Sequence, residues 1–535
     1  MNVFDYAWNS DIVTGKRKAD KPDLITFANT HLFVYLLNNA IERKESVMIH
    51  CDVDVDGIGT GYILGRFIEA VGGLKPSYII NKSKEHGINE KHVEYFKNNK
   101  IDLLIIVDSG SNDIEYIKNM NCNVLVIDHH EVEHSDLKGI TNDGKHSYAI
   151  INNTIQCFNF DVIKKYFNKI NTETSEKLKE YVVDDRMSCG LVIYELLRVY
   201  QELFKLGNIL ENLRLYQWVG ITLFTDEIEL NNERNQWYIE HTVNKDEVES
   251  NLNILIKELN PYKYRLDKSF ICYTLAPTFN RAIRAEKSSE ALDIVINHPE
   301  QVSKLSVYRK SQDIAIEKSI EGVYFGDTYV IKDNTYTGIS NNYSGVVGSR
   351  LCGDYNKNAF VYHVDSEGIA KGSFRGRINN LNYLEFINSN NLGIAQGHKS
   401  AFGLKCKSEN VHNLMQSLQA YESQYQDKLT YGGYKYLLTA GVLNEIERGL
   451  FVIEDIEKFK KDWGIWSLAV GNSRVSNKEQ ILLTVSIQDV KLCDTKGKIY
   501  IYDILGLKCK AFKPISDKIL NIYAEYSTEI DLYIK

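Results

Sequence analysis

The stretch Val47-Met48-Ile49-His50-Cys51-Asp52-Val53-Asp54-Val55-Asp56-Gly57 joins an apolar run to a cluster of polar side chains. The run is rich in β-branched residues and predicts a buried strand. Four potential metal ligands, one His and three Asp, crowd the end of this strand directly before a glycine. Carboxylates at this density need a partner that neutralises their charge, and a divalent cation is the obvious one. The stretch therefore predicts a metal site at a strand end.

Strands and helices alternate on both sides of this stretch. Strand patterns cover 46–51, 76–80, 101–107 and 123–127, and helical patterns cover 58–71, 90–98 and 114–119. This alternation predicts an α/β domain with a parallel sheet and right-handed crossovers. Ligands of such sheets bind beyond the carboxyl ends of the strands.

Three polar clusters fall at those strand ends: His50–Asp56, Asp108-Ser109-Gly110 and Asp128-His129-His130. Asp108 could bridge two cations, and a neutral imidazole of His129 or His130 could ligate one. Asp226 closes a long apolar segment and could supply a last carboxylate. A single Asp at a strand end is most often a helix cap. Three clusters on adjacent strand ends are better explained by a two-metal hydrolase.

Two other metal motifs fit less well. Asp52-x-Asp54-x-Asp56-Gly57 resembles the opening of a calcium-binding EF-hand loop, but Ile63 stands where that loop requires Glu. His130-Glu131-Val132-Glu133-His134 matches the HExxH pattern of zinc proteases, which works only on a helix. Here the pattern directly follows a predicted strand, so we interpret it as coincidental.

The composition is that of an ordinary globular protein. The chain has 535 residues, 44% of them hydrophobic and 25% charged, which is enough for roughly two to four domains. Nine cysteines without a CxxC pair indicate reduced thiols and a cytoplasmic location. No apolar run predicts a membrane span, and the start lacks a signal-peptide pattern. The formal charge of −8 neither favours nor excludes nucleic acid.

The type of secondary structure is expected to change several times along the rest of the chain. Helices are expected at 190–200 and 211–223, followed by a charged helix over 300–322 that is long enough to bridge two domains. Strands are expected at 328–331 and 359–364, with a glycine-rich turn at 345–348. Residues 481–512 read as mainly β.

The ordered clusters resemble the DHH phosphoesterase superfamily, and within it the RecJ single-strand exonucleases, from about residue 45 to 410. Further matching segments are Ser188-Cys189-Gly190-Leu191-Val192, Pro277-Thr278-Phe279-Asn280-Arg281-Ala282-Ile283-Arg284, Gly345-Val346-Val347-Gly348, Lys371-Gly372-Ser373-Phe374-Arg375 and Gln396-Gly397-His398-Lys399-Ser400-Ala401-Phe402-Gly403. The last three look like the DHHA1 domain. The resemblance implies a DHH domain over 1–300, a connecting helix over 301–325, a smaller α/β DHHA1-like domain over 326–415, and a β-rich, OB-like domain over 416–535.

The resemblance also implies how a two-metal centre would be built. One metal would be held by His50, Asp54 and Asp108, and the other by Asp56, Asp108, His129 and Asp226. Two Mn²⁺ ions are expected, with Mg²⁺ as the alternative. A bridging water would be the nucleophile, and His130 would face the scissile phosphate. Asp52 and Asp128 would orient ligands without binding metal.

Substrate contacts are implied at five residues: Asn280, Arg284, Ser373, Arg375 and His398. Ser373 and Arg375 would grip a 5′ phosphate. The chain departs from the family at several positions, with Thr278 for an arginine, Glu85-His86-Gly87 for Gly-Tyr-Gly, Gln396-Gly397-His398 for Gly-Gly-His, and a shorter segment after Gly348. These departures affect the grip on substrate and leave the metal ligands intact.

The last ~115 residues interleave aromatic and basic residues, as base-stacking platforms do. The residues concerned are Tyr500, Tyr502, Lys508, Lys510 and Phe512. A β core with solvated lysines would give the same pattern.

The function implied is exonucleolytic hydrolysis of single-stranded DNA, 5′ to 3′, releasing mononucleotides, with a role in repair and recombination. RNA is an alternative polymer, and a single-strand-binding protein or a helicase is an expected partner. A phosphodiesterase for short oligonucleotides or cyclic dinucleotides is the second hypothesis. Those relatives are shorter and lack the connecting helix and the C-terminal domain. A non-catalytic replication factor is the third.

Overall fold

A computed structural model describes residues 19–534 except for some gaps. The gaps are 83–84, 156–177, 181–185, 227, 229, 231, 244, 261–264, 356, 378–380, 433–450, 453–466, 471–479, 487–489, 497–498, 505–506, 512–518 and 526–530. The chain divides into two compact units. The first comprises Asp20–Ile228 and Trp237–Arg309, and the second comprises Lys310–Lys535 with the stretch Glu229–Gln236. Each unit is described by itself.

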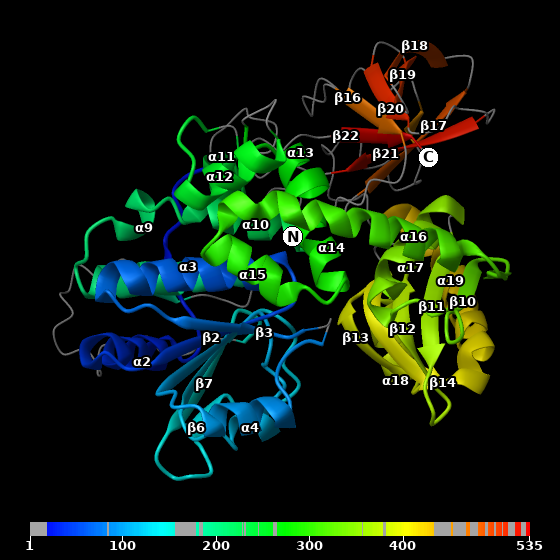
Figure 1. Ribbon diagram of the computed structural model, residues 1–535. Helices are drawn as coiled ribbons and strands as arrows, with labels where there is room; N and C mark the ends of the chain where they lie inside the picture. The colour runs from blue at the N-terminus through cyan, green and yellow to red at the C-terminus, as the bar shows by residue number, and fades with distance from the viewer. Residues whose placement is uncertain are drawn as a thin grey trace. The chain divides into compact units, whose positions relative to one another are not determined.

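A six-stranded sheet forms the centre of the first unit, in the order β3-β2-β4-β5-β7-β6. Figure 1 labels β2, β3, β6 and β7 of this sheet. Every pair is parallel except the edge pair of β6 and β7. The strands are β2 (Val47–Cys51), β3 (Ser77–Ile80), β4 (Leu103–Val107), β5 (Asn123–Asp128), β6 (Lys138–Ile140) and β7 (Ser147–Asn152). All of β4 is buried, as its unbroken apolar sequence predicts.

Helices cover both faces of this sheet. One face packs on α4 (Glu90–Asn98) and α5 (Ile114–Ile117). The opposite face packs on α2 (Thr30–Arg43), α3 (Val55–Gly72) and α8 (Cys189–Leu203), so α3 and α4 lie on opposite sides of the strands in Figure 1. A second, two-stranded sheet pairs β1 (Leu24–Thr26) with β8 (Leu178–Glu180) in parallel. The parallel α/β architecture predicted from the sequence is confirmed.

Two glycines let α3 approach the sheet closely. A Cβ at Gly57 would lie 2.7 Å from the backbone nitrogen and oxygen of Asp52, and one at Gly61 would lie 2.3 Å from Cys51 Sγ. The first contact is with rigid backbone, so any side chain at 57 would push the first turn of α3 away from the end of β2. That turn carries Asp54 and Asp56.

Further helices follow the sheet along the chain. They are α9 (Ile209–Asn212), α10 (Tyr216–Thr225), α11 (Glu233–Thr242), α12 (Ser250–Leu259), α13 (Lys268–Phe270), the π-helix η1 (Ile271–Leu275), α14 (Ala276–Arg284), α15 (Ser288–Ile296), the 3₁₀-helix η2 (Pro299–Val307) and α16 (Tyr308–Ile320). Among the described residues, no helix is long and apolar enough to cross a membrane.

The second unit contains a six-stranded sheet in the order β13-β14-β12-β11-β10-β9. Its strands are β9 (Tyr324–Phe325), β10 (Tyr329–Asp333), β11 (Asn358–Val364), β12 (Ile369–Arg375), β13 (Ile394–His398) and β14 (Ala401–Lys407). The accompanying helices are η3 (Asn341–Tyr343), α17 (Ser344–Tyr355), α18 (Tyr383–Ser389), η4 (Ser408–Asn410) and α19 (Val411–Gly432). α17 crosses β11 and β12.

The C-terminal part forms an eight-stranded sheet in the order β15-β17-β21-β22-β16-β20-β19-β18. The strands are β15 (Phe451–Val452), β16 (Ser467–Val470), β17 (Gln480–Ser486), β18 (Val490–Lys496), β19 (Ile499–Ile504), β20 (Leu507–Ala511), β21 (Ile519–Glu525) and β22 (Asp531–Ile534). The predicted β-rich character is confirmed, and its OB-like nature stays a prediction. The ladder pairs Tyr500 with Ala511 and Tyr502 with Cys509, so the tyrosine positions do not pair with Lys508 or Lys510. Phe512 lies outside the described residues.

The predicted continuous helix over 300–322 is wrong in its first half. Residues 299–307 form a 3₁₀-helix, and α16 begins at Tyr308. Pro299, Val302 and Leu305 are the buried residues of the first segment. Their spacing of three matches the three residues per turn of a 3₁₀-helix, so packing selects this conformation.

The predicted glycine-rich turn at 345–348 is also wrong, because these residues lie in α17. The glycines serve packing rather than turning. A Cβ at Gly345 would lie 2.7 Å from Arg375 Nη2, and one at Gly348 would lie 3.4 Å from Arg375 Cγ. Small residues let the helix pass close to β12.

Two helix limits differ from the prediction as well. α3 begins at Val55, three residues early, because the Asp54 side chain caps it by accepting a hydrogen bond from Gly57 N at 3.0 Å. The helix expected over 211–223 is broken between α9 and α10, where Arg214 has a φ of 54°. The limits predicted for the domains stay predictions, and α19 runs across the one placed at 415/416.

Candidate metal centre

Side chains from four chain segments converge at the carboxyl ends of β2, β4 and β5. Three groups of possible ligands have donor atoms that all lie within 4.8 Å of one another. The groups are Asp56, His129 and Asp226; Asp108, His129 and His130; and Asp52, Asp54 and Asp108. Shared members join the three groups into one site. Only His50 of the predicted ligands belongs to none of the groups found among the described residues.

Asp56 lies in the first turn of α3 and is buried. Its carboxylate accepts hydrogen bonds from Cys189 N at 2.8 Å, Gly190 N at 2.9 Å and Thr60 Oγ1 at 3.1 Å. The backbone donors belong to the first turn of α8. A helix N-terminus therefore holds this carboxylate in place and favours its charge.

Asp108 follows β4 in an unusual backbone conformation. Its φ of 67° is in the left-handed region, and its N–H donates to Ile127 O at 2.9 Å. A non-glycine residue in this region is strained and is often found at functional sites. The conformation brings Asp108 Oδ1 to 3.2 Å from His129 Nε2.

His129 lies at the centre of the acidic cluster. Its Nε2 atom is 3.4 Å from Asp226 Oδ2 and 4.0 Å from Asp56 Oδ2. Asp226 is the C-cap residue of α10, so a helix end delivers this last carboxylate.

Asp128 orients the neighbouring His130 and the loop around it. Its Oδ1 accepts from His129 N at 2.7 Å and lies 2.8 Å from His130 Nδ1, while its Oδ2 accepts from Ser111 N at 3.0 Å. Although burial acts in the opposite sense on both groups, the pairing raises the pKa of His130 and lowers the pKa of Asp128. The Asp128 carboxylate thus favours the protonated form of the half-exposed His130 ring and fixes its orientation. No helix follows β5 at residues 130–134, which agrees with rejecting the zinc-protease motif.

The electrostatics of the cluster fit a divalent cation. Burial, and then the neighbouring carboxylates, raise the pKa values of Asp56 and Asp108. Each carboxylate thus disfavours the charge of the other, and a divalent cation between them would remove that conflict. The donor set of carboxylate oxygens and imidazole nitrogens suits Mn²⁺ or Mg²⁺.

His50 is fully buried in β2, and neither of its ring nitrogens has a hydrogen-bond partner among the described residues. Burial, followed by the proximity of His92, lowers the pKa of His50 to about 4. A neutral imidazole with unsatisfied nitrogens fits a metal ligand chemically. Its ring packs edge-on against His92 at 5.2 Å.

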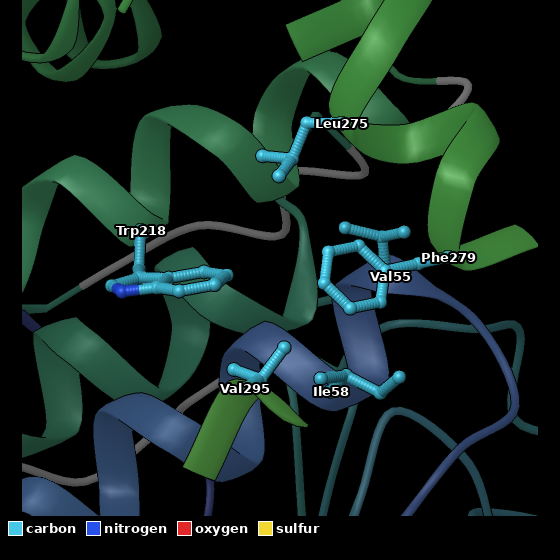
Figure 2. Close-up of a pocket in the computed structure, with 6 residues that line it drawn as sticks. All are labelled: Val55, Ile58, Trp218, Leu275, Phe279 and Val295. Carbon is cyan, nitrogen blue, oxygen red and sulfur yellow. The ribbon is translucent and has the colours of Figure 1, made fainter. Parts of the chain in front are cut away.

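A small apolar pocket lies beside the first turn of α3. Figure 2 shows Trp218 of α10 and Phe279 of α14 converging on the start of α3. The pocket is lined by Val55, Ile58, Trp218, Leu275, Phe279 and Val295. Val55 lies between Asp54 and Asp56, so packing here sets the first turn of α3.

The structure separates the five predicted substrate residues into two sets. Asn280 and Arg284 are one helical turn apart on α14, in the unit that holds the metal cluster. Ser373 and Arg375 belong to the other unit, where both lie against Gly345 in the first turn of α17. Arg375 Nε donates to Ser349 Oγ at 3.2 Å. The backbone of His398 ends β13, and its side chain lies outside the described residues.

Sequence reasoning missed two kinds of residue. The N–H groups of Cys189 and Gly190 donate to the Asp56 carboxylate. The sequence identifies their segment only as a match to the family and does not predict this contact. His86 contacts Asp52, with 2.7 Å between His86 Nδ1 and Asp52 Oδ2. The only signal for His86 was its departure from the family pattern. Asp52 itself lies in a ligand group, whereas the resemblance implied a supporting role.

Part of the chain is similar to a known protein family. Residues 46–205 match the DHH family, N-terminal domain. These residues therefore resemble the N-terminal domain of DHH-family proteins. Over 446 residues it is 23% identical to the single-stranded-DNA-specific exonuclease RecJ of Bacillus subtilis (strain 168), an alignment that covers 78% of this chain and 50% of that protein. The chain thus spans about half the length of the curated relative it matches.

Two solved structures share the fold described above. RecJ from Thermus thermophilus in complex with Mn²⁺ matches with a TM-score of 0.64 at 14% identity, covering 99% of this chain and 76% of that one. An exonuclease RecJ bound to manganese matches with a TM-score of 0.53 at 18% identity, covering 75% of this chain and 96% of that one. At these identities the likeness establishes the fold alone.

Proposed function

We propose that this RecJ-like chain is a metal-dependent phosphodiesterase that degrades single-stranded DNA from an end. The observation that carries the proposal is the convergence of Asp56, Asp108, His129 and Asp226, with His129 Nε2 at 3.2–4.0 Å from all three carboxylates. The resemblance to RecJ exonucleases supports the substrate class. Release of mononucleotides in the 5′ to 3′ direction is the finer part of the proposal.

The proposal includes two cation positions. His50, Asp54 and Asp108 would hold one, and Asp56, Asp108, His129 and Asp226 the other, with Mn²⁺ preferred over Mg²⁺. Bound cations would supply an acidified water and neutralise charge on the phosphate. Asp108 would belong to both positions. Both ligand sets are proposals. Asp52 is an alternative to His50 as a ligand of the first cation.

The residues around the cluster have distinct parts in this proposal. His130, oriented and charged through Asp128, would donate a hydrogen bond to a nonbridging oxygen of the scissile phosphate. Asn280 and Arg284 would contact the strand beside the centre. Ser373 and Arg375 would hold a terminal phosphate, aided by the N-terminus of α17.

Degradation of end-labelled single-stranded DNA with Mn²⁺, beside a dinucleotide substrate, tests the proposal. We expect metal-dependent release of mononucleotides from the polymer and loss of activity in Asp108→Ala. Cleavage of the dinucleotide alone would favour the small-molecule phosphodiesterase. Hydrolysis of neither substrate, with no difference between the parent and Asp108→Ala, would contradict both enzymatic functions and favour a non-catalytic factor.

Location and partners are further parts of the proposal. We place the protein in the cytoplasm, where its substrate would arise during repair or recombination. A single-strand-binding protein or a helicase would supply single strands. Co-purification of such a partner with the full chain tests this expectation.

A further inference from the structure

The loop between β3 and α4 brings a further imidazole, that of His86, to the metal cluster. His86 occupies this loop where the resemblance predicts the tyrosine of Gly-Tyr-Gly. Its Nδ1 atom is 2.7 Å from Asp52 Oδ2. The Asp52 side chain is 1% exposed, whereas the His86 side chain is 58% exposed. The imidazole therefore covers a buried carboxylate from the solvent side.

The two oxygens of Asp52 have different surroundings. Oδ2 is engaged by His86, and Oδ1 is buried without a hydrogen-bond partner among the described residues. Asp52 also shares a ligand group with Asp54 and Asp108. A buried carboxylate oxygen without a partner is costly, and a cation beside Asp54 and Asp108 would satisfy it.

Other residues also hold the loop around His86. Asn81 Nδ2 donates to Glu85 O at 2.6 Å and to Gly87 O at 2.8 Å. Asp113 Oδ2 accepts from Ile88 N at 2.8 Å. These bonds hold the backbone on both sides of residue 86, from which the imidazole reaches Asp52.

The arrangement repeats that of a second pair in the same centre. His130 Nδ1 lies 2.8 Å from Asp128 Oδ1, again joining a more exposed imidazole to a buried carboxylate. In that pair the carboxylate orients the imidazole, since backbone N–H groups already hold Asp128. No backbone donor to the Asp52 carboxylate is found among the described residues, so there the imidazole orients the carboxylate.

We propose that His86 is a positioning residue of the metal centre, which holds Oδ2 of Asp52 so that Oδ1 serves as a ligand beside Asp54 and Asp108. The inference rests on the proposed function in assuming a cation at this place. Asp52 then binds metal, and the histidine of this chain has a role that the family's Gly-Tyr-Gly loop does not predict. Loss of an outer hydrogen-bond partner typically lowers metal affinity about 10–100-fold.

Mn²⁺ binding to the full chain, measured by calorimetry and by electron paramagnetic resonance, tests this role without relying on activity. We expect His86→Ala to weaken one Mn²⁺ site about 10–100-fold and to leave the metal-free melting temperature unchanged. His86→Asn should restore most of the affinity, because its amide nitrogen can take the place of Nδ1. His146→Ala is the matched control, since His146 pairs with Asp143 at 2.5 Å outside the ligand groups.

Three results would overturn the inference. Parental Mn²⁺ affinity in His86→Ala would show that Asp52 needs no support. A lowered metal-free melting temperature in both His86 variants, with affinity restored in neither, would make His86 a simple structural tether. If the parent chain bound no Mn²⁺, both this inference and the proposed function would be contradicted. The titration of the parent chain distinguishes that outcome from the other two.

Discussion

At the scale of single residues, Asp108 combines three features that are unfavourable for folding. It is buried, its backbone is in the left-handed region, and it lies among other carboxylates. Burial and the charges of Asp56 and Asp54 raise its pKa in the folded state. Ionising Asp108 is therefore more costly in the folded chain than in the unfolded chain, and a bound cation would offset that cost.

Asp108→Asn is expected to separate these two effects. The amide keeps the shape and removes the charge, so the metal-free protein should gain on the order of 1 kcal/mol in free energy of unfolding at pH 7. Hydrolysis should fall by more than the roughly 10–100-fold that loss of an outer partner causes. Urea unfolding without metal and a nuclease assay check the two parts. A metal-free variant less stable than its parent would contradict the electrostatic explanation.

His31 gives the pH dependence of stability at the same scale. This residue of α2 is buried, and burial, with a smaller effect of Lys138, lowers its pKa from 6.5 to about 4. Between these values the unfolded chain takes up a proton that the folded chain does not. The free energy of unfolding should therefore fall by on the order of 1–3 kcal/mol as the pH falls from about 6.5 to about 4.

His31→Leu isolates this contribution, because leucine does not titrate. Chemical unfolding of the parent and the variant at several pH values should give a flatter dependence for the variant in this window. Parallel curves would show that His31 titrates alike in both states.

At the scale of elements, Glu249 joins three helices around the site. Its buried carboxylate accepts hydrogen bonds from Tyr62 of α3 at 2.8 Å, from Trp218 of α10 at 3.2 Å, and from the backbone of Leu252 in α12 at 3.0 Å. α3 carries Asp56, and α10 leads to Asp226. One carboxylate thus sets the spacing of two helices that present ligands.

Glu249→Ala should destabilise the first unit by about 2–4 kcal/mol, since it leaves buried donors unpaired and removes a helix cap. Mn²⁺ affinity should fall as well, because Asp56 and Asp226 lose their common support. Thermal unfolding and metal titration check both effects. Glu300→Ala, at an exposed position of η2, is the control and should change neither. A destabilised variant with parental Mn²⁺ affinity would show that Glu249 supports the fold alone.

At the scale of elements, sequence patterns were sufficient to predict some strands but not every helix. The carboxyl ends of the strands at 47–51, 103–107 and 123–128 were predicted to within one residue, because continuous apolar runs between polar clusters admit few alternatives. The glycines of α17 suggested a turn because their packing partner, Arg375, is distant in the sequence. The 3₁₀-helix η2 was missed because its three-residue spacing also fits an α-helical face.

At the scale of the molecule, metal binding should act on one unit. All the ligand groups found among the described residues belong to the unit of Asp20–Ile228 and Trp237–Arg309. A ligand that binds the folded state alone stabilises it by about 2.7 kcal/mol at a free concentration of 100 Kd. Mn²⁺ should therefore slow hydrogen exchange in β2, β4 and β5 and leave exchange in β11 and β12 unchanged. Mass spectrometry of peptic fragments checks this, and equal protection in both units would contradict it.

The sequence by itself determined the parallel α/β sheet and the ligand clusters at its carboxyl edge. Both follow from patterns within a few residues: an apolar run, the polar residues that end it, and the rule that parallel strands end at one edge. Only the tertiary structure decided which atoms meet. The N–H groups of Cys189 and Gly190 hold Asp56 from more than 130 residues away, and His86 reaches Asp52 across 34. Such contacts depend on how helices and loops pack over the sheet, which no local pattern records.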